Sequence, residues 1–182
     1  MKNCLYVGSF NPITRAHENI AKDLLKENII DKVYFLPVNS NKNDLVSIKN
    51  RINMIKLIKN NNIEIINIYD FNKSGLFDYN ILKEINNTYN ITHLVMGSDL
   101  FYKIKTFNNY QDILSEYKII IIKRDNNIDN YINDYYDDYN NIILINKLYD
   151  GSSMIAKENL NKDNKYLDKK VFDYIKENNL YN

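Results

Sequence analysis

The stretch Tyr6–Leu25, which reads YVGSFNPITRAHENIAKDLL, decides the fold. A short apolar run ends at Gly8-Ser9, a loop follows, and apolar residues then recur at helical spacing from His17 to Lys26. A short apolar run closed by glycine is typical of a buried strand. The sequence therefore predicts a strand that is joined to an amphipathic helix by a tight turn containing glycine.

The same alternation of strand and helix continues along the chain. Further apolar runs that predict strands occupy residues 31–38, 63–68, 92–99, 118–124 and 141–146. Further helical patterns occupy residues 48–59, with Ser47 as N-cap, and residues 76–85, 107–117, 152–160 and 168–180. Such alternation predicts an α/β fold, Rossmann-like and doubly wound, with a mainly parallel sheet and helices on both faces. We expect a single domain over residues 1–182, whose small C-terminal helical part spans about 151–182.

Two Gly-Ser pairs follow predicted strands, Gly8-Ser9 and Gly97-Ser98. Both are expected at the carboxyl edge of the sheet, where parallel sheets bind ligands. The helix after the first pair presents unpaired N–H groups and a positive dipole end, which suit a phosphate. Thr14 and His17 share one face of its first turn. Spacing alone leaves open that Thr14 is only a helix cap and that His17 is an ordinary surface histidine.

Composition narrows the classes of protein. The 182 residues are 45% hydrophobic and 26% charged, enough for a core with a polar surface. A net charge of +1 argues against a general nucleic-acid binder. Cys4, the only cysteine, excludes an intrachain disulfide and is predicted to be a buried strand residue.

Targeting signals are not evident in the sequence. The N-terminal apolar stretch is too short for a signal peptide, and no apolar run approaches the ~18 residues of a membrane span. We expect a cytoplasmic protein with neither membrane nor nucleic acid as partner. Whether it forms a homo-oligomer stays open.

The sequence GSFNPITRAH, residues 8–17, resembles the phosphate-binding motif of the nucleotidyltransferase superfamily, whose first helix begins T/H-x-G-H. The matching positions are Gly8, Phe10, Asn11, Pro12, Thr14 and His17. Ala16 replaces the commoner glycine. The resemblance implies that His17 and Thr14 are catalytic and contact ATP. It also implies that Gly8 binds ATP and that Ser9 and Phe10 contact both nucleotides.

Residues 92–124, THLVMGSDLFYKIKTFNNYQDILSEYKIIIIKR, resemble the middle of the nicotinate and nicotinamide mononucleotide adenylyltransferases. Gly97, Ser98, Asp99 and Arg124 match that family. The chain has no tryptophan, and Phe107 takes the position of the ring that the family stacks on the pyridine. The resemblance implies that Gly97 and Asp99 bind ATP, and that Phe107 and Arg124 bind the mononucleotide.

Residues 150–160, DGSSMIAKENL, resemble the family's late I-S-S-T-x-I-R motif. Ser152 and Ser153 match, Met154 replaces threonine, and Lys157 replaces arginine, which exchanges a guanidinium fork for a point charge. The resemblance implies that Ser152, Ser153 and Lys157 hold the phosphates of ATP. Read without the family, SSMIAK is an ordinary N-cap and first helical turn.

The loop after the second predicted strand also resembles the family, with Lys42 and Arg51 in register. It implies that Lys42 contacts a phosphate at the mononucleotide site, and we interpret Arg51 as structural. The carboxylate-rich segment Asp125–Asn141 lacks the glycine and final glutamate of an EF-hand, so we predict a solvated helix or loop with a tyrosine face.

The resemblance implies an adenylyltransferase that joins ATP to nicotinate or nicotinamide mononucleotide and releases pyrophosphate. Mg²⁺ is expected to arrive with ATP and to bridge its phosphates, and no protein ligand is assigned to a metal. Pantetheine-phosphate adenylyltransferase, which shares the GSFxPITxxH pattern, is the nearest alternative, and cytidylyltransferases follow. A catalytically weakened nucleotide-binding or regulatory relative is a third alternative, suggested by Met154 and Lys157. The chain is far too short for a class I aminoacyl-tRNA synthetase.

Overall fold

The computed structural model describes residues 1–40, 43–58, 60–136, 140–162 and 164–181. Within these residues, six parallel strands form one sheet in the order β3-β2-β1-β4-β5-β6. The strands are β1 (Asn3–Gly8), β2 (Lys32–Pro37), β3 (Ile63–Ile65), β4 (Ile91–Gly97), β5 (Lys118–Ile122) and β6 (Ile142–Ile145). This arrangement confirms the predicted α/β, doubly wound fold.

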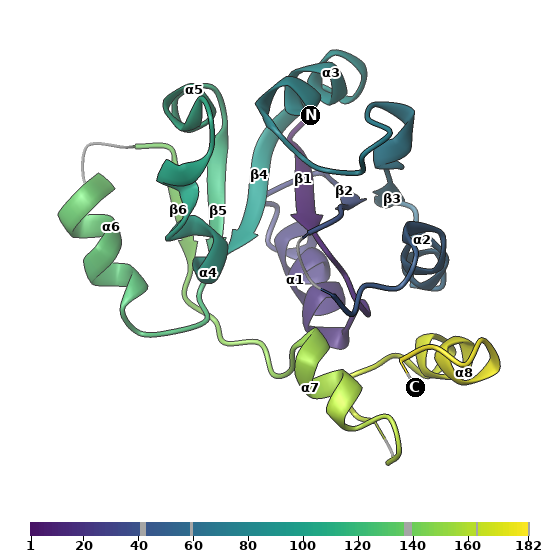
Figure 1. The fold of residues 1–182 in the computed structure, drawn as a ribbon. Helices are drawn as coiled ribbons and strands as arrows, with labels where there is room; N and C mark the ends of the chain where they lie inside the picture. The colour runs from purple at the N-terminus through teal and green to yellow at the C-terminus, as the bar shows by residue number, and fades with distance from the viewer. Residues whose placement is uncertain (41–42, 59, 137–139, 163, 182) are drawn as a thin grey trace.

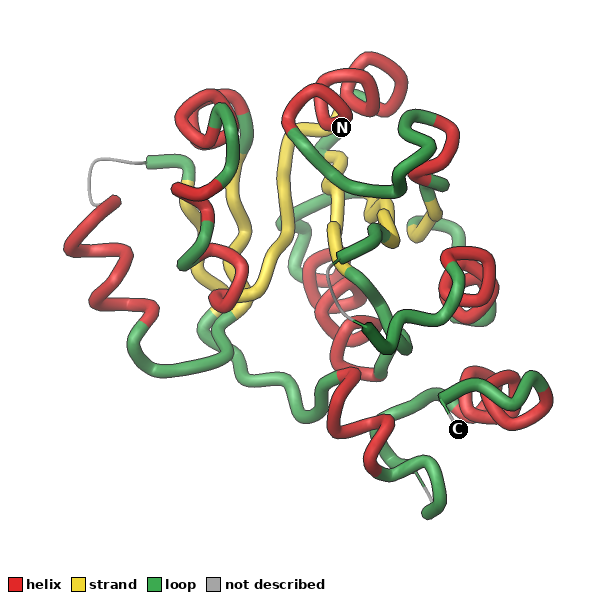
Figure 2. The backbone as a smooth tube through the Cα atoms, in the orientation of Figure 1, coloured by secondary structure: helices red, strands yellow, loops and turns green. Residues whose placement is uncertain are grey.

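The helices lie in the crossovers and after the last strand (Figures 1 and 2). They are α1 (Arg15–Lys26), α2 (Ile48–Lys56), α3 (Tyr79–Tyr89), α4 (Ser98–Phe101), α5 (Tyr110–Glu116), α6 (Ile128–Tyr136), α7 (Ser153–Glu158) and α8 (Lys169–Glu177). Two 3₁₀ turns, Ile68–Asp70 and Ile104–Thr106, complete the regular structure of the described residues. No helix among these residues is long and apolar enough to cross a membrane.

The sheet separates two hydrophobic clusters, one against each face. One cluster contains buried residues of α3, α4, α5 and α6. The other contains buried residues of α1, α2, α7 and α8, together with Cys4, which is fully buried in β1 as predicted. Parallel strands are buried on both faces, and this explains their continuous apolar runs, such as Ile119–Ile122 in β5.

The strand order creates a switch point between β1 and β4. The chain winds from β1 outward through β2 to β3, then returns to β4 on the other side of β1 and continues to β6. Crossovers on the two sides leave opposite faces of the sheet, so a crevice opens at the carboxyl ends of β1 and β4. Both Gly-Ser pairs lie there, since β1 ends at Gly8 and β4 ends at Gly97.

Several strands and helices begin or end at residues other than those predicted from the sequence. The third strand ends at Ile65, because the chain then turns into the 3₁₀ segment at Ile68. Ser47 caps α2 as predicted, its hydroxyl accepting from Asn50 N–H at 3.2 Å. Within the tyrosine-rich segment, Ile128–Tyr136 form the helix α6, whose Tyr136 is buried against Phe101 with ring centroids 4.9 Å apart.

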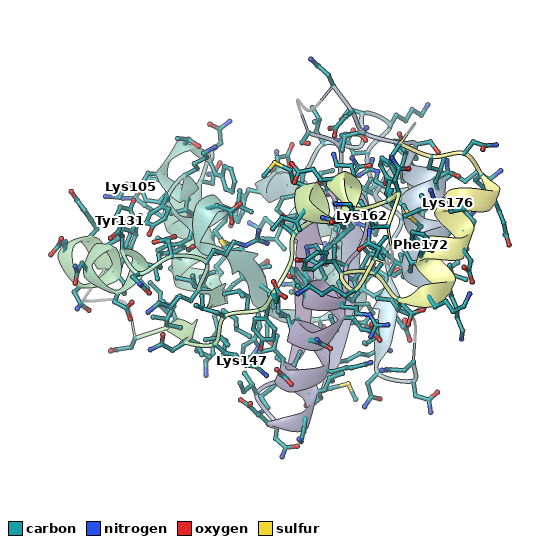
Figure 3. The ribbon with its side chains drawn as sticks, turned by 90° about the horizontal axis from the view of Figure 1, so that it is seen from below. Lys105, Tyr131, Lys147, Lys162, Phe172 and Lys176 are labelled. Atoms are coloured by element: carbon teal, nitrogen blue, oxygen red, sulfur yellow. The ribbon has the colours of Figure 1, made fainter. Side chains whose placement is uncertain are left out.

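The two ends of the sheet carry different helices. Seen from below, α8 with Phe172 and Lys176 lies at one end, and Lys105 and Tyr131 lie at the other (Figure 3). At that other end, Tyr131 packs edge-to-face on Tyr102 with ring centroids 4.8 Å apart. Tyr131 and Tyr136 of α6 therefore pack against the core, whereas Tyr135 is 57% exposed.

Arg51 ties the loops at the carboxyl edge together. Its side chain is fully buried, as expected of a structural arginine. Its guanidinium donates to the carbonyls of Ser9 at 2.9 Å, Val38 at 2.7 Å and Val46 at 3.0 Å, and to Asn39 Oδ1 at 2.8 Å. The loops after β1 and β2 and the entry to α2 thus share one anchor.

Candidate active site

The start of α1 fixes the orientation of the His17 ring. Thr14 is the N-cap of α1, and its backbone N–H donates to His17 Nδ1 at 3.1 Å. A backbone N–H can only donate, so Nδ1 is an acceptor and the proton of the neutral ring lies on Nε2. The hydroxyl of Thr14, 2.8 Å from Nδ1, can donate to the same nitrogen. His17 can therefore offer an N–H donor to an anion.

His17 is neutral in the folded protein. Burial lowers the pKa of the imidazole to about 3, and the positive charge of Arg124 contributes in the same direction. Only 9% of the residue is exposed, and Phe10 packs edge-to-face on its ring with centroids 5.3 Å apart. At neutral pH the ring acts as a hydrogen-bond donor and carries no charge of its own.

A cavity of about 560 Å³ opens over the switch point. We call it the larger cavity. It is lined by residues from the ends of β1, β2, β4 and β5 and from the start of α7: Tyr6, Val7, Gly8, Ser9, Phe10, His17, Val38, Ser40, Gly97, Asp99, Leu100, Lys103, Arg124, Ser152, Ser153 and Met154. It joins the loops of both halves of the sheet, as expected of a doubly wound fold.

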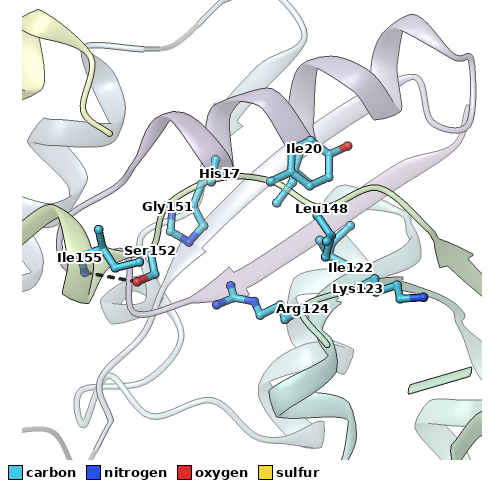
Figure 4. Close-up of a pocket in the computed structure, with 11 residues that line it drawn as sticks. His17, Ile20, Ile122, Lys123, Arg124, Leu148, Gly151, Ser152 and Ile155 are labelled. Carbon is cyan, nitrogen blue, oxygen red and sulfur yellow. Dashed lines mark hydrogen bonds between the residues drawn. The ribbon is translucent and has the colours of Figure 1, made fainter. Parts of the chain in front are cut away.

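A smaller cavity of about 210 Å³ lies beside it, between α1 and the chain that leads to α7 (Figure 4). Its apolar walls come from Ala16 and Ile20 of α1, Ile122 of β5, and Leu148 and Tyr149. His17, Arg124 and Ser152 line both cavities. Figure 4 shows the His17 ring directed toward the space between Ser152 and Arg124. These three side chains thus mark the boundary between the two cavities.

Gly97 leaves room for an ion pair at this boundary. Arg124 Nε lies 3.4 Å from Asp99 Oδ1, and both side chains are well exposed to solvent. A Cβ atom on Gly97 would lie 2.4 Å from that Asp99 oxygen and 2.6 Å from Arg124 Nε. An exposed pair of this kind is weak, so Arg124 is available to an anionic ligand.

Gly8, which lines the larger cavity, also has a local structural role. A Cβ atom on Gly8 would meet the Phe10 ring at 3.0 Å. Phe10 itself is 2% exposed, at a φ of 45°, and packs against Tyr6 and Phe35 as well as His17. Glycine is therefore needed so that Phe10 can fold under the turn and support the His17 ring.

Comparisons with known proteins agree with this geometry. A model of the cytidylyltransferase-like family matches residues 5–167. A probable nicotinate-nucleotide adenylyltransferase of Fusobacterium nucleatum is 32% identical over 163 residues, which cover 84% of each chain. One of Acholeplasma laidlawii is 30% identical over 184 residues, which cover 97% of this chain and 96% of the relative. This chain belongs to the nicotinate-nucleotide adenylyltransferase family.

The fold agrees with solved members of the nicotinate-nucleotide adenylyltransferase family. Plasmodium falciparum nicotinic acid mononucleotide adenylyltransferase, solved in complex with NaAD, is similar with a TM-score of 0.79 and 29% sequence identity. The similarity covers 100% of this chain and 98% of that one. The same enzyme complexed with APC gives the same TM-score. The family resemblance stated from the motifs is therefore confirmed.

Most of the residues assigned from the family resemblance meet at one place. Those that line the larger cavity are Gly8, Ser9, Phe10, His17, Gly97, Asp99, Arg124, Ser152 and Ser153. Ser152 also caps α7, its hydroxyl accepting from Ile155 N–H at 3.3 Å, while Ser153 donates to the carbonyl of Pro12 at 2.8 Å. Lys42 lies outside the described residues.

Three assigned residues lie apart from the cavity lining. Thr14 is 2% exposed, and its hydroxyl is engaged with His17 Nδ1. Lys157 forms an ion pair with Asp44. Phe107 packs on the hydrophobic cluster on the α3–α6 face and lines neither cavity. Local hydrogen bonding engages Thr14, charge pairing engages Lys157, and apolar packing of a partly buried ring engages Phe107.

Other lining residues were not assigned from the sequence. Lys103 brings a cation to the larger cavity, and Tyr149 closes the smaller one. Lys103 is one of 24 basic residues and has no distinguishing neighbour. The feature of the sequence that could have pointed to Lys103 is its place shortly after Gly97-Ser98. For Tyr149 it is the place shortly before Gly151-Ser152.

Proposed function

We propose that this chain transfers the adenylyl group of ATP to the 5′-phosphate of nicotinate mononucleotide, forming the dinucleotide and pyrophosphate. Membership of the family supports the reaction class, and the names of the relatives support nicotinate over nicotinamide. The observation that carries the proposal is the position of His17, a neutral donor at the boundary of two adjoining cavities.

The shapes of the cavities suggest how the substrates divide between them. The smaller cavity, of about 210 Å³, has apolar side chains on both walls that suit a flat base. The larger one, of about 560 Å³, has room for phosphates and a second nucleotide beside Ser9, Lys103 and Ser153. In this arrangement the phosphates of ATP cross the boundary beside His17, Arg124 and Ser152. The mononucleotide phosphate enters from the larger cavity and faces the α-phosphorus.

The chemical step needs alignment and charge stabilisation more than a base. A phosphate oxygen of the mononucleotide attacks the α-phosphorus, and the bond from that phosphorus to the oxygen bridging to the β-phosphorus breaks. The attacking phosphate is already anionic near neutral pH, so no side chain has to remove a proton. His17 Nε2–H and Arg124 would stabilise the charge that builds on the α- and β-phosphate oxygens. The amides and dipole at the start of α1 act in the same direction.

A divalent metal ion is expected to accompany ATP, and we propose Mg²⁺. Mg²⁺ favours oxygen ligands and is commonly held by substrate phosphates with one or two carboxylates. Asp99 is the one carboxylate that lines either cavity among the described residues, so the donor set fits an ion brought by the substrate. Such an ion neutralises phosphate charge during the displacement. Among these residues, no cluster of three or more His, Cys, Asp and Glu forms a separate metal centre.

The test is a steady-state assay of pyrophosphate release from Mg-ATP with nicotinate mononucleotide, nicotinamide mononucleotide or phosphopantetheine. The product is identified by chromatography and mass. We expect the largest kcat/KM with nicotinate mononucleotide. Turnover confined to phosphopantetheine would overturn the assignment. ATP binding in calorimetry without pyrophosphate release for any acceptor would indicate a binding or regulatory relative.

A further inference from the structure

The segment between β6 and α7, residues 146–152, runs beside α1 and forms one wall of the smaller cavity (Figure 4). We call it the strap. Leu148, Tyr149, Gly151 and Ser152 of the strap line this cavity. The opposite wall is α1 itself, through Ala16, His17 and Ile20. The width of the cavity therefore depends on how closely the strap is held against α1.

Asp23 of α1 holds the strap near its start. Asp23 Oδ2 accepts from Lys147 Nζ at 2.5 Å and from Tyr149 Oη at 2.9 Å. Lys147 Nζ also lies 5.1 Å from the centroid of the Tyr149 ring. Figure 3 shows Lys147 beside α1. The hydrogen bond from Lys147 is the main cause that keeps the pKa of Asp23 below its ordinary value, so the carboxylate is ionised at neutral pH.

The end of the strap is anchored separately. Gly151 has a φ of 96°, and a Cβ atom there would lie 2.6 Å from the Tyr166 ring. Just beyond the strap, Ser153 Oγ donates to the carbonyl of Pro12 at 2.8 Å. Because that end is fixed, loss of the hydrogen bonds to Asp23 would allow Leu148 and Tyr149, which line the smaller cavity, to move away from α1. Asp23 lines neither cavity, so its influence on a ligand acts through Tyr149.

We propose that Asp23 is a positioning residue that sets the selectivity of this enzyme for the base of the nucleoside triphosphate. It does so by clamping Tyr149 and the strap against α1, which keeps the smaller cavity narrow. The inference rests on the proposed function, in which that cavity takes the base. A pocket whose walls are held close together discriminates between bases by shape, and a loosened wall discriminates less.

The experiment compares Asp23→Asn and Tyr149→Phe with the wild-type chain. Pyrophosphate release is measured with ATP, GTP and CTP at saturating nicotinate mononucleotide, and the KM of the mononucleotide is measured separately. Tyr149→Phe retains the ring in the cavity wall and removes only the hydroxyl that reaches Asp23. The matched control is Asp150→Asn, because Asp150 also lies in the strap but pairs with exposed Lys165 and lines neither cavity.

We expect Asp23→Asn and Tyr149→Phe each to raise the KM of ATP roughly 3- to 10-fold and to lower the preference for ATP over GTP and CTP. The KM of nicotinate mononucleotide should stay within about twofold. A role confined to stability would lower the melting temperature and leave these ratios unchanged. Unchanged ATP KM and base preference in both variants, or equal effects of Asp150→Asn, would overturn the proposal. If Asp23→Asn does not fold, Tyr149→Phe decides.

Failure of the proposed function can be distinguished from failure of the clamp, by which we mean the hydrogen bonds from Lys147 and Tyr149 to Asp23. A wild-type chain that releases no pyrophosphate overturns the function alone. The clamp is then decided by calorimetric ATP affinity in the same variants. A roughly 3- to 10-fold loss in Tyr149→Phe relative to Asp150→Asn supports the clamp, and equal affinities overturn it.

Discussion

At His17, the chemistry depends on which ring nitrogen carries the proton. The Thr14 N–H occupies Nδ1, so Nε2–H is the donor available to a phosphate. We therefore propose that Thr14 acts through His17, as a positioning residue, because both its backbone N–H and its hydroxyl contact Nδ1. That Thr14 and His17 both contact ATP stays a prediction from the family resemblance.

We expect His17→Ala to lower kcat by roughly 10²-fold or more, since it removes a preorganised donor to developing charge. The measurement is pyrophosphate release at saturating ATP and nicotinate mononucleotide. The matched variant Thr14→Ser retains a hydroxyl beside Nδ1, so its kcat should stay within a fewfold of wild type. A near-normal kcat in His17→Ala would remove His17 from the reaction.

The depressed pKa of His17 predicts a pH dependence of stability. Burial lowers the pKa of His17 to about 3 in the folded state, whereas an unfolded histidine titrates near 6.5. The unfolded state therefore binds the proton first, and the free energy of unfolding falls as pH decreases from about 6.5 toward 3. Well below pH 6.5 this contribution is about 1.4 kcal/mol per pH unit.

Urea unfolding of the wild type and of His17→Gln between pH 7 and pH 4.5 tests this dependence. The wild type should lose more stability than the variant on acidification, because glutamine does not titrate. Parallel pH curves for the two proteins would show that His17 is not buried in its neutral form.

At the scale of elements, Arg51 of α2 is the anchor between three loops of the carboxyl edge. Burial lowers its pKa, and hydrogen bonds to carbonyl and amide oxygens stabilise the guanidinium. Ser9 and Val38, two of its partners, also line the larger cavity. Arg51 therefore holds two residues that line the larger cavity, but its own side chain does not line this cavity.

We expect Arg51→Met to lower the free energy of unfolding by about 3 kcal/mol or more, because it leaves several buried oxygens without donors. Arg51→Lys should recover only part of this loss, since an ammonium group cannot reproduce the planar fork. Urea denaturation measures both. A loss below about 1 kcal/mol in Arg51→Met would contradict this role.

At the scale of the whole molecule, the C-terminus returns to the first motif. Tyr181 Oη donates to Asn11 Oδ1 at 3.0 Å, and the same oxygen accepts from Val46 N–H at 3.1 Å. Asn11 Nδ2 donates to the carbonyl of Asp44 at 3.0 Å. The tail after α8, the loop before α2 and the loop after β1 therefore meet at one asparagine.

We expect Tyr181→Phe to lower the free energy of unfolding by about 1 kcal/mol. The effect is modest because Asn11 Oδ1 keeps its bond from Val46 N–H. Thermal or urea unfolding gives the value. Tyr166→Phe is the control, because it also removes one tyrosine hydroxyl but its ring packs at Gly151 and not at Asn11. Equal stability of Tyr181→Phe and the wild type would mean that the tail does not stabilise this loop.

The local structure could be predicted from the amino-acid sequence alone: the six strands, the crossover helices, the cap at Ser47 and the two Gly-Ser turns. Apolar periodicity and capping preferences act over a few residues, so they can be recognised in one chain. The motifs at His17, Gly97 and Ser152 likewise identified the family and most residues that line the larger cavity. The single domain over residues 1–182 and the individual roles of the site residues remain predictions.

Only the tertiary structure decided which distant groups meet. Pairing β1 with β4 brings Gly8 and Gly97 to one crevice, and the order of strands depends on packing among all elements. Lys157 pairs with Asp44, Phe107 packs on the core, and Asp23 meets Tyr149 across the strap. These contacts join residues far apart in the chain. The physical reason is that burial and charge pairing depend on three-dimensional neighbours, which local periodicity does not specify.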